Sequence, residues 1–137
     1  MKYFYVLIII VAFFSCKTQK QINETGYTAI HFGSGGGVTN NVTSYSLYSD
    51  GKVWKNNSIN KDLTLIKKFP KSKVLELYMM VKDNGLDTVR FSRPGNMYYF
   101  VDIVKGDKNN KITWGRKDTA PPVEVLKLYD NLIKSIK

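Results

Sequence analysis

Few residues in this sequence could carry out chemistry. Histidine occurs once, at His31, and cysteine once, at Cys16. A zinc site or a cysteine–histidine nucleophile needs more of these side chains than the sequence offers. Acidic residues such as Asp50 and Asp107 fall in turn-forming sequences, and their spacing does not indicate a pair converging in a cleft. We therefore expect no enzymatic activity, no metal and no cofactor, and keep a small envelope hydrolase as the least favoured alternative.

Lipidation is the chemistry that Cys16 suits best. Lys2 precedes an apolar run from Tyr3 to Phe14, and the small residue Ser15 comes just before the cysteine. A run of about 12 residues suits a signal peptide and is shorter than the roughly 20 that span a bilayer as a helix. The segment resembles the type II signal of bacterial lipoproteins, which implies cleavage before Cys16 and attachment of palmitate-like acyl chains. The alternative is a secreted chain with a free cysteine.

This signal divides the chain into three predicted parts. Residues 1–15 are the expected signal peptide, 16–26 the lipidated cysteine with a flexible tether, and 27–137 a single domain. The tether assignment rests on a polar sequence without periodicity. Cleavage leaves 137 − 15 = 122 residues, enough for one compact domain.

The formal net charge of +10 favours anionic partners. Because the basic residues are scattered, we expect contact with anionic lipid head groups or envelope polyanions and no binding of nucleic acid. The bias towards Lys, Asn, Ile and Tyr resembles lipoproteins of Bacteroidota. Their surface-export signal places acidic residues after the cysteine, whereas Lys17 and Lys20 follow it here. The expected location is the outer membrane, facing the periplasm, and the sequence leaves the oligomeric state open.

Alternating apolar and polar residues predict a sheet of six or seven strands. The expected strands cover residues 27–32, 43–49, 52–55, 63–69, 87–92, 97–105 and 111–115, with a short helix as the alternative for 63–69. Helical spacing follows Ser72, an expected N-cap, and ends at Asn84-Gly85. A second helix begins after Asp118 or Thr119, and its predicted buried stripe is Val123, Leu126, Tyr129, Leu132, Ile133 and Ile136. The expected fold is α+β, an antiparallel sheet with two helices on one face.

A glycine run, GSGGG at residues 33–37, interrupts the first strand. Successive glycine amides can cradle a phosphate, but phosphate loops lead into a helix or carry the lysine and hydroxyl of GxxxxGK[ST]. Here a β-type sequence follows. The run is therefore predicted to form a flexible hairpin tip or bulge, where Gly35, Gly36 and Gly37 let a partner approach the backbone.

Strand alternation also predicts one recognition surface. If Tyr99, Val101 and Ile103 face the helices, the opposite sheet face holds the candidate binding residues Arg90, Tyr98, Phe100 and Asp102. Tyrosine, phenylalanine and arginine are typical of binding surfaces. The equally weighted alternative is a sheet face that loops or the tether merely shield.

The segment from Ile30 to Lys55, with its glycine run followed by YSLYSDGKVWK, resembles the start of emfourin-type metalloprotease inhibitors. That resemblance implies inhibition by a loop and identifies no inhibitory residue. The segments PGN at 94–96 and TWG at 113–115 resemble an uncharacterised family of small bacterial lipoproteins instead. The leading hypothesis is a lipid-anchored binding module that engages an envelope protein or polymer, and the emfourin-like inhibitor is the runner-up.

Overall fold

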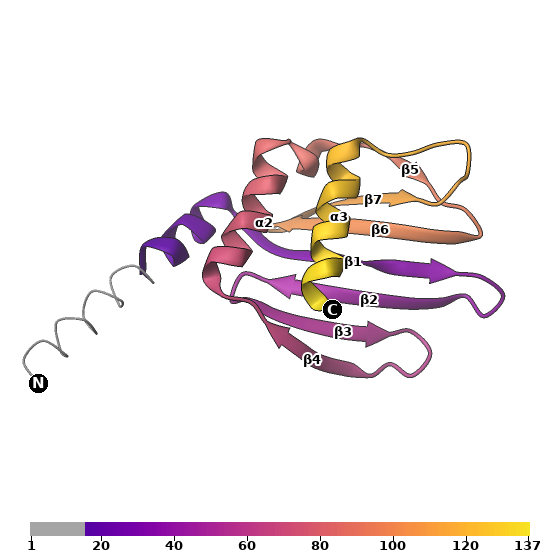
Figure 1. The fold of residues 1–137 in the computed structure, drawn as a ribbon, viewed down its shortest axis with the longest axis horizontal. Coiled ribbons are helices and arrows are strands. Elements are labelled where there is room, and N and C mark those ends of the chain that lie inside the picture. The colour runs from indigo at the N-terminus through magenta and orange to yellow at the C-terminus, as the bar shows by residue number, and fades with distance from the viewer. Residues whose placement is uncertain (1–15) are drawn as a thin grey trace, which may run out of the picture.

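The computed structural model describes residues 16–137 and forms one sheet with helices on one side (Figure 1). The strand order is β4-β3-β2-β1-β6-β7-β5, and every pairing is antiparallel except that of β5 with β7. This confirms the predicted α+β class. The strands are β1 (Tyr27–Gly36), β2 (Asn41–Tyr48), β3 (Lys52–Asn57), β4 (Leu63–Lys68), β5 (Ser92–Arg93), β6 (Met97–Lys105) and β7 (Lys108–Trp114).

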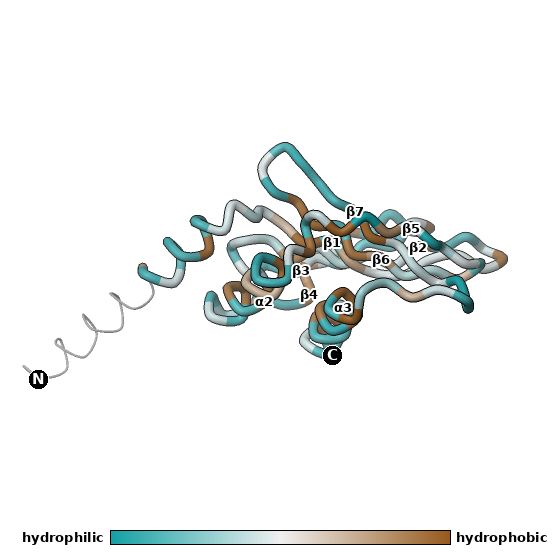
Figure 2. Tube along the Cα trace, turned by 90° about the horizontal axis from the view of Figure 1, so that it is seen from above, coloured by the Kyte–Doolittle hydropathy of each residue, from teal (hydrophilic) through white to brown (hydrophobic). Residues whose placement is uncertain are grey.

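Helices α2 (Lys71–Asp83) and α3 (Val123–Ile136) both cross the same face of the sheet, as Figures 1 and 2 show. The core lies between them and the sheet. Alternate residues of the strands point into it, among them Ile30 and Phe32 from the central strand β1. Within residues 16–137, α2 and α3 thus leave the opposite sheet face uncovered.

The buried side of α3 differs from the predicted stripe. Within the predicted stripe Leu132 is fully buried, and Leu126, Tyr129, Ile133 and Ile136 pack partly buried against the core, but Val123 is 54% exposed. The stripe omitted Val125 and Leu128, which are fully buried. Apolar residues occupy a wide arc of this helix, so the helical period alone does not decide which line of the arc meets the sheet.

The start of α2 also differs from the prediction. The helix begins at Lys71 with Pro70 in the N-cap position, and no side chain caps it. Ser72 therefore lies inside the first turn, where proline's fixed backbone angle already favours the entry into the helix.

The predicted strand over residues 87–92 is wrong. The chain forms the short 3-10 helix η1 (Leu86–Thr88) instead, and only Ser92 and Arg93 pair with the sheet. The amide of Asn110 donates to the backbone carbonyls of Leu86 (3.2 Å) and Val89 (2.8 Å). A side chain thus satisfies carbonyls that a strand would pair with a neighbour.

The segment expected to be an irregular tether is helical over residues 16–25. Ile22 is fully buried in the core, and the hydroxyl of Thr25 donates to the Ile22 carbonyl (2.7 Å) and accepts from the amide of Tyr27 (3.2 Å). These bonds join the helix directly to β1. Residues 16–137 thus contain three α-helices where two were predicted, and none of them is long and apolar enough to cross a membrane. The predicted signal peptide lies outside the described residues.

Candidate binding surface

The sheet face opposite α2 and α3 (Figure 2) is here called the open face. It carries most of the predicted recognition residues. Strand register decides its membership, because directly paired residues point to the same side of a sheet. His31 lies between Ser46 and Asp102, and Gly35 lies between Val42 and Tyr98. The register extends the face to both sides, and its main members are His31, Val42, Ser46, Tyr48, Trp54, Tyr98, Phe100, Asp102, Lys111 and Thr113.

A row of polar side chains crosses the open face over four adjacent strands. His31 Nδ1 and Ser46 Oγ are hydrogen-bonded at 2.7 Å. Asp102 is the partner of His31 on β6, and its two carboxylate oxygens accept from the Asn109 amide at 3.0 and 3.2 Å. Burial lowers the pKa of His31 below its ordinary value of 6.5, and the charge of Asp102 partly opposes this shift. The imidazole is therefore mainly neutral at neutral pH.

Serine, histidine and aspartate side by side raise the question of nucleophilic hydrolysis. Such a reaction also needs donors that hold an oxyanion beside the serine. Ser46 lies on β2, which pairs with β1 on one side and β3 on the other. Its neighbouring backbone amides are thus used by the sheet and do not point at the serine as oxyanion donors.

Aromatic rings cover the strand portion of the glycine run. A β-carbon at Gly35 would lie 2.8 Å from Tyr98 Oη and 2.9 Å from Val42 Cγ2, closer than side-chain contacts allow. Gly35 therefore leaves room for the ring of Tyr98 to lie against the strand. Phe100 is only 5% exposed, and Lys111 Nζ lies 4.6 Å from the centre of its ring. Glycine and aromatic residues thus pack together across β1 and β6.

The structure brings together three of the four predicted patch residues. Tyr98, Phe100 and Asp102 lie on the open face, but Phe100 is buried and contributes support more than contact area. Arg90 does not belong to the patch, because its segment leaves the sheet and its guanidinium donates to the side chain of Asn110. The sequence did not predict that Trp54 lies on the open face. Its alternation within residues 52–55 does not give the register of β3 against β2, and that register places Trp54 beside Ser46.

The glycine run is mostly strand, and only its end forms a turn. Gly36 has a φ of +101°, and a β-carbon there would lie 2.0 Å from the carbonyl oxygen of Asn96. The amide of Gly37 donates to the same carbonyl at 2.9 Å. The predicted hairpin tip is thus shorter than expected and is fastened to the turn before β6.

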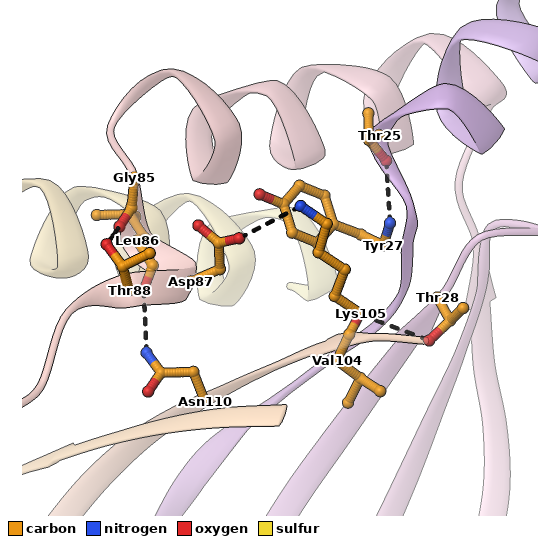
Figure 3. Close-up of polar contacts among 10 residues, drawn as sticks. All are labelled: Thr25, Tyr27, Thr28, Gly85, Leu86, Asp87, Thr88, Val104, Lys105 and Asn110. Carbon is orange, nitrogen blue, oxygen red and sulfur yellow. Dashed lines mark hydrogen bonds and ion pairs between the residues drawn. The ribbon is translucent and has the colours of Figure 1, made fainter. Parts of the chain in front are cut away.

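Arg90 lines a pocket of about 470 Å³ between η1 and the β6–β7 hairpin, part of which Figure 3 shows. Asp87 pairs with Lys105 Nζ at 3.6 Å, and the ammonium lies 5.1 Å from the ring centre of Tyr27. Burial first, then the charge and hydrogen bond of Asp87, raise the pKa of Tyr27 to about 12. Asp87, Lys105 and Tyr27 thus interact with one another, and Asn110 binds the backbone carbonyls of Leu86 and Val89 beside them. We interpret this network as a structural contact that holds η1 against the sheet.

Within residues 16–137 no cluster of three or more histidine, cysteine, aspartate or glutamate residues is placed to hold a metal ion. In comparisons with known proteins, no family model and no curated protein matches the chain.

Proposed function

We propose that this chain is a lipid-anchored module of the bacterial envelope, facing the periplasm, that binds a protein or an envelope polymer through the open face. The observation that carries the proposal is a sheet with α2 and α3 on one side, while strand register places aromatic and polar side chains on the other side. Such aromatic surfaces are typical of binding sites, because rigid rings give large contact areas at low entropic cost.

The chemistry of the open face favours a partner with mixed polar and apolar character. Tyr48 is 41% exposed and contacts the edge of His31, and Trp54 is half-buried on the neighbouring strand. Asp102 and Lys111 add one charge of each sign at the far side. The overall charge of +10 favours anionic partners, so we expect an acidic envelope protein or an anionic polymer.

The anchor supports the same proposal from the sequence. Cys16 is exposed and is the first residue of the helical segment over residues 16–25. An acyl chain there would hold the domain at a membrane surface, where its partners would be envelope components.

Two tyrosines of equal exposure on opposite faces give a matched test. Tyr48 lies on the open face at 41% exposure, whereas Tyr99 is 42% exposed on the helix side, stacked against Trp114. We expect Tyr48→Ala to weaken capture of partners from envelope membranes and Tyr99→Ala to retain it. Melting temperatures of both variants control for folding. Equal loss of capture by both variants would contradict the assignment to the open face.

A second candidate, an emfourin-like inhibitor, is favoured by one observation. Val38 is fully exposed at the tip of the β1–β2 hairpin. This tip lies beside the start of β6, where Met97 is also exposed. A protruding aliphatic tip is a shape that a protease cleft can accept. If Val38→Asp abolishes inhibition of a metalloprotease while Tyr48→Ala retains it, this candidate replaces the open-face proposal.

A further inference from the structure

The free edge of the sheet at β4 is exposed along its whole length and carries three large apolar side chains. All six residues of this strand are exposed, including Leu63 at 65%, Leu65 at 46% and Ile66 at 38%. In the part of the chain that the structure describes, β4 is the last strand in the order and pairs only with β3 (Figure 1). Its outer backbone donors and acceptors are therefore available to another chain.

A β-bulge shapes this edge. On β3, Trp54 pairs with Leu65 and the preceding residue, Val53, pairs with Lys67. Ile66 is therefore the extra, unpaired residue of the bulge. Ile66 lines a groove of about 280 Å³ together with Tyr45, Ile133 and Ile136. Lys67 Nζ donates to the carbonyl of Ser135, 2.8 Å away, near the end of α3. The bulge thus ties β4 to α3 and opens an apolar groove beside the edge.

Lysine side chains surround this groove. Lys55 and Lys137 line it, and Lys67 and Lys68 end the strand. Among the residues that the structure describes, no salt bridge includes Lys55, Lys68 or Lys137. A second copy would bring its own net charge of +10 to this edge, and like-charge repulsion disfavours that pairing.

We propose that β4 accepts an extended acidic segment of another protein as an eighth strand. Its backbone would continue the hydrogen-bonded ladder, which is a common mode of peptide recognition. Its aliphatic side chains would contact Ile66 and Ile136 in the groove. Its carboxylates alternate with them and would point to the other side of the sheet, where Lys68 pairs with Lys52. This inference is independent of the open face and of the lipid anchor.

The test uses the full chain in nonionic detergent with two capped peptides, one of alternating valine and glutamate and one with lysine in place of glutamate. We expect the glutamate peptide to slow hydrogen exchange of the β4 amides and to change the fluorescence of Trp54, which pairs with Leu65. The lysine peptide should bind at least about tenfold more weakly. Open-face variants such as Tyr48→Ala should bind the glutamate peptide normally, which separates this site from the proposed function.

A matched pair of variants locates the site. Ile66→Glu replaces an apolar contact of the groove with a carboxylate and should weaken binding of the acidic peptide at least about tenfold. Val123→Glu makes a similar change at an exposed position at the start of α3 and should bind normally. Amide spectra of both variants control for folding.

Three results would overturn the inference. The first is unchanged exchange of the β4 amides at saturating glutamate peptide. The second is equal affinity for the two peptides, which would remove the charge argument. The third is concentration-dependent protection of the β4 amides in the free protein, which would mean that a second copy occupies the edge.

Discussion

Replacing Ile22 with alanine tests whether the segment after Cys16 is a flexible tether or part of the domain. Ile22 is fully buried in the core cluster. The substitution removes roughly three methylene equivalents, and at ~0.8 kcal/mol each their transfer to water costs about 2.4 kcal/mol. The cavity left behind adds to this cost because the surroundings relax only partly. We therefore expect the free energy of unfolding to fall by about 3 to 4 kcal/mol.

The assay is urea denaturation of the chain that begins at residue 16, with unfolding monitored by tryptophan fluorescence. Gln21→Ala is the matched control, since Gln21 is the exposed neighbour of Ile22 in the same helical segment. A substitution at such a surface position should change the free energy of unfolding by less than about 0.5 kcal/mol. Comparing the two variants separates core packing from helix propensity.

A loss below about 0.5 kcal/mol for Ile22→Ala would refute the reasoning, because exposed positions change stability by no more than this. The helix over residues 16–25 would then not dock, and a flexible tether would be correct. The expected loss has a functional consequence. A helical rise of ~1.5 Å per residue places Cys16 only about 9 Å along the axis from the buried Ile22, so a lipid at Cys16 would hold the domain close to the membrane.

Three further predictions concern the anchor, the histidine and the glycine turn. Cys16→Ser should abolish labelling by a palmitate analogue and release the protein from the membrane fraction; equal labelling of both forms would end the lipoprotein proposal. Burial lowers the pKa of His31 in the folded state below its ordinary 6.5, so the unfolded chain binds the proton more readily. Unfolding free energy should therefore fall as pH drops through about 6.5 towards the folded-state pKa, and His31→Asn should flatten this dependence in urea melts; an identical pH profile would contradict it. Gly36→Ala should cost about 1 to 3 kcal/mol in urea melts through strained φ and contact with Asn96, whereas Gly106→Ala, also at positive φ but with open space around it, should cost less; equal losses would show that the contact is unimportant.

Local sequence patterns were sufficient to predict the positions of most strands. The alternation of residues 97–105 predicts the full extent of β6, and Asp50-Gly51 predicts the turn between β2 and β3. The apolar run at 63–69, for which a helix was the alternative, forms strand β4 over 63–68. These features depend on neighbours in sequence, so a period of two and a turn dipeptide are enough to predict them.

Features that depend on distant residues could not be predicted in this way. Arg90 was assigned to the patch by alternation, but Asn110, far along the chain, binds the carbonyls of its segment and keeps it out of the sheet. Ile22 lies in a polar sequence, and only its burial beneath the rest of the domain reveals its role. In both cases the deciding contacts join segments that are remote in sequence.

The sequence by itself determined the α+β class, most strands, the single histidine and cysteine, and the basic charge, because each follows from composition or local period. Only the tertiary structure decided which line of α3 is buried, that His31 lies between Ser46 and Asp102, and that a bulge turns Ile66 towards α3. The physical reason is strand register. A shift of one residue would send each side chain to the other face, and register is set by packing across the whole sheet.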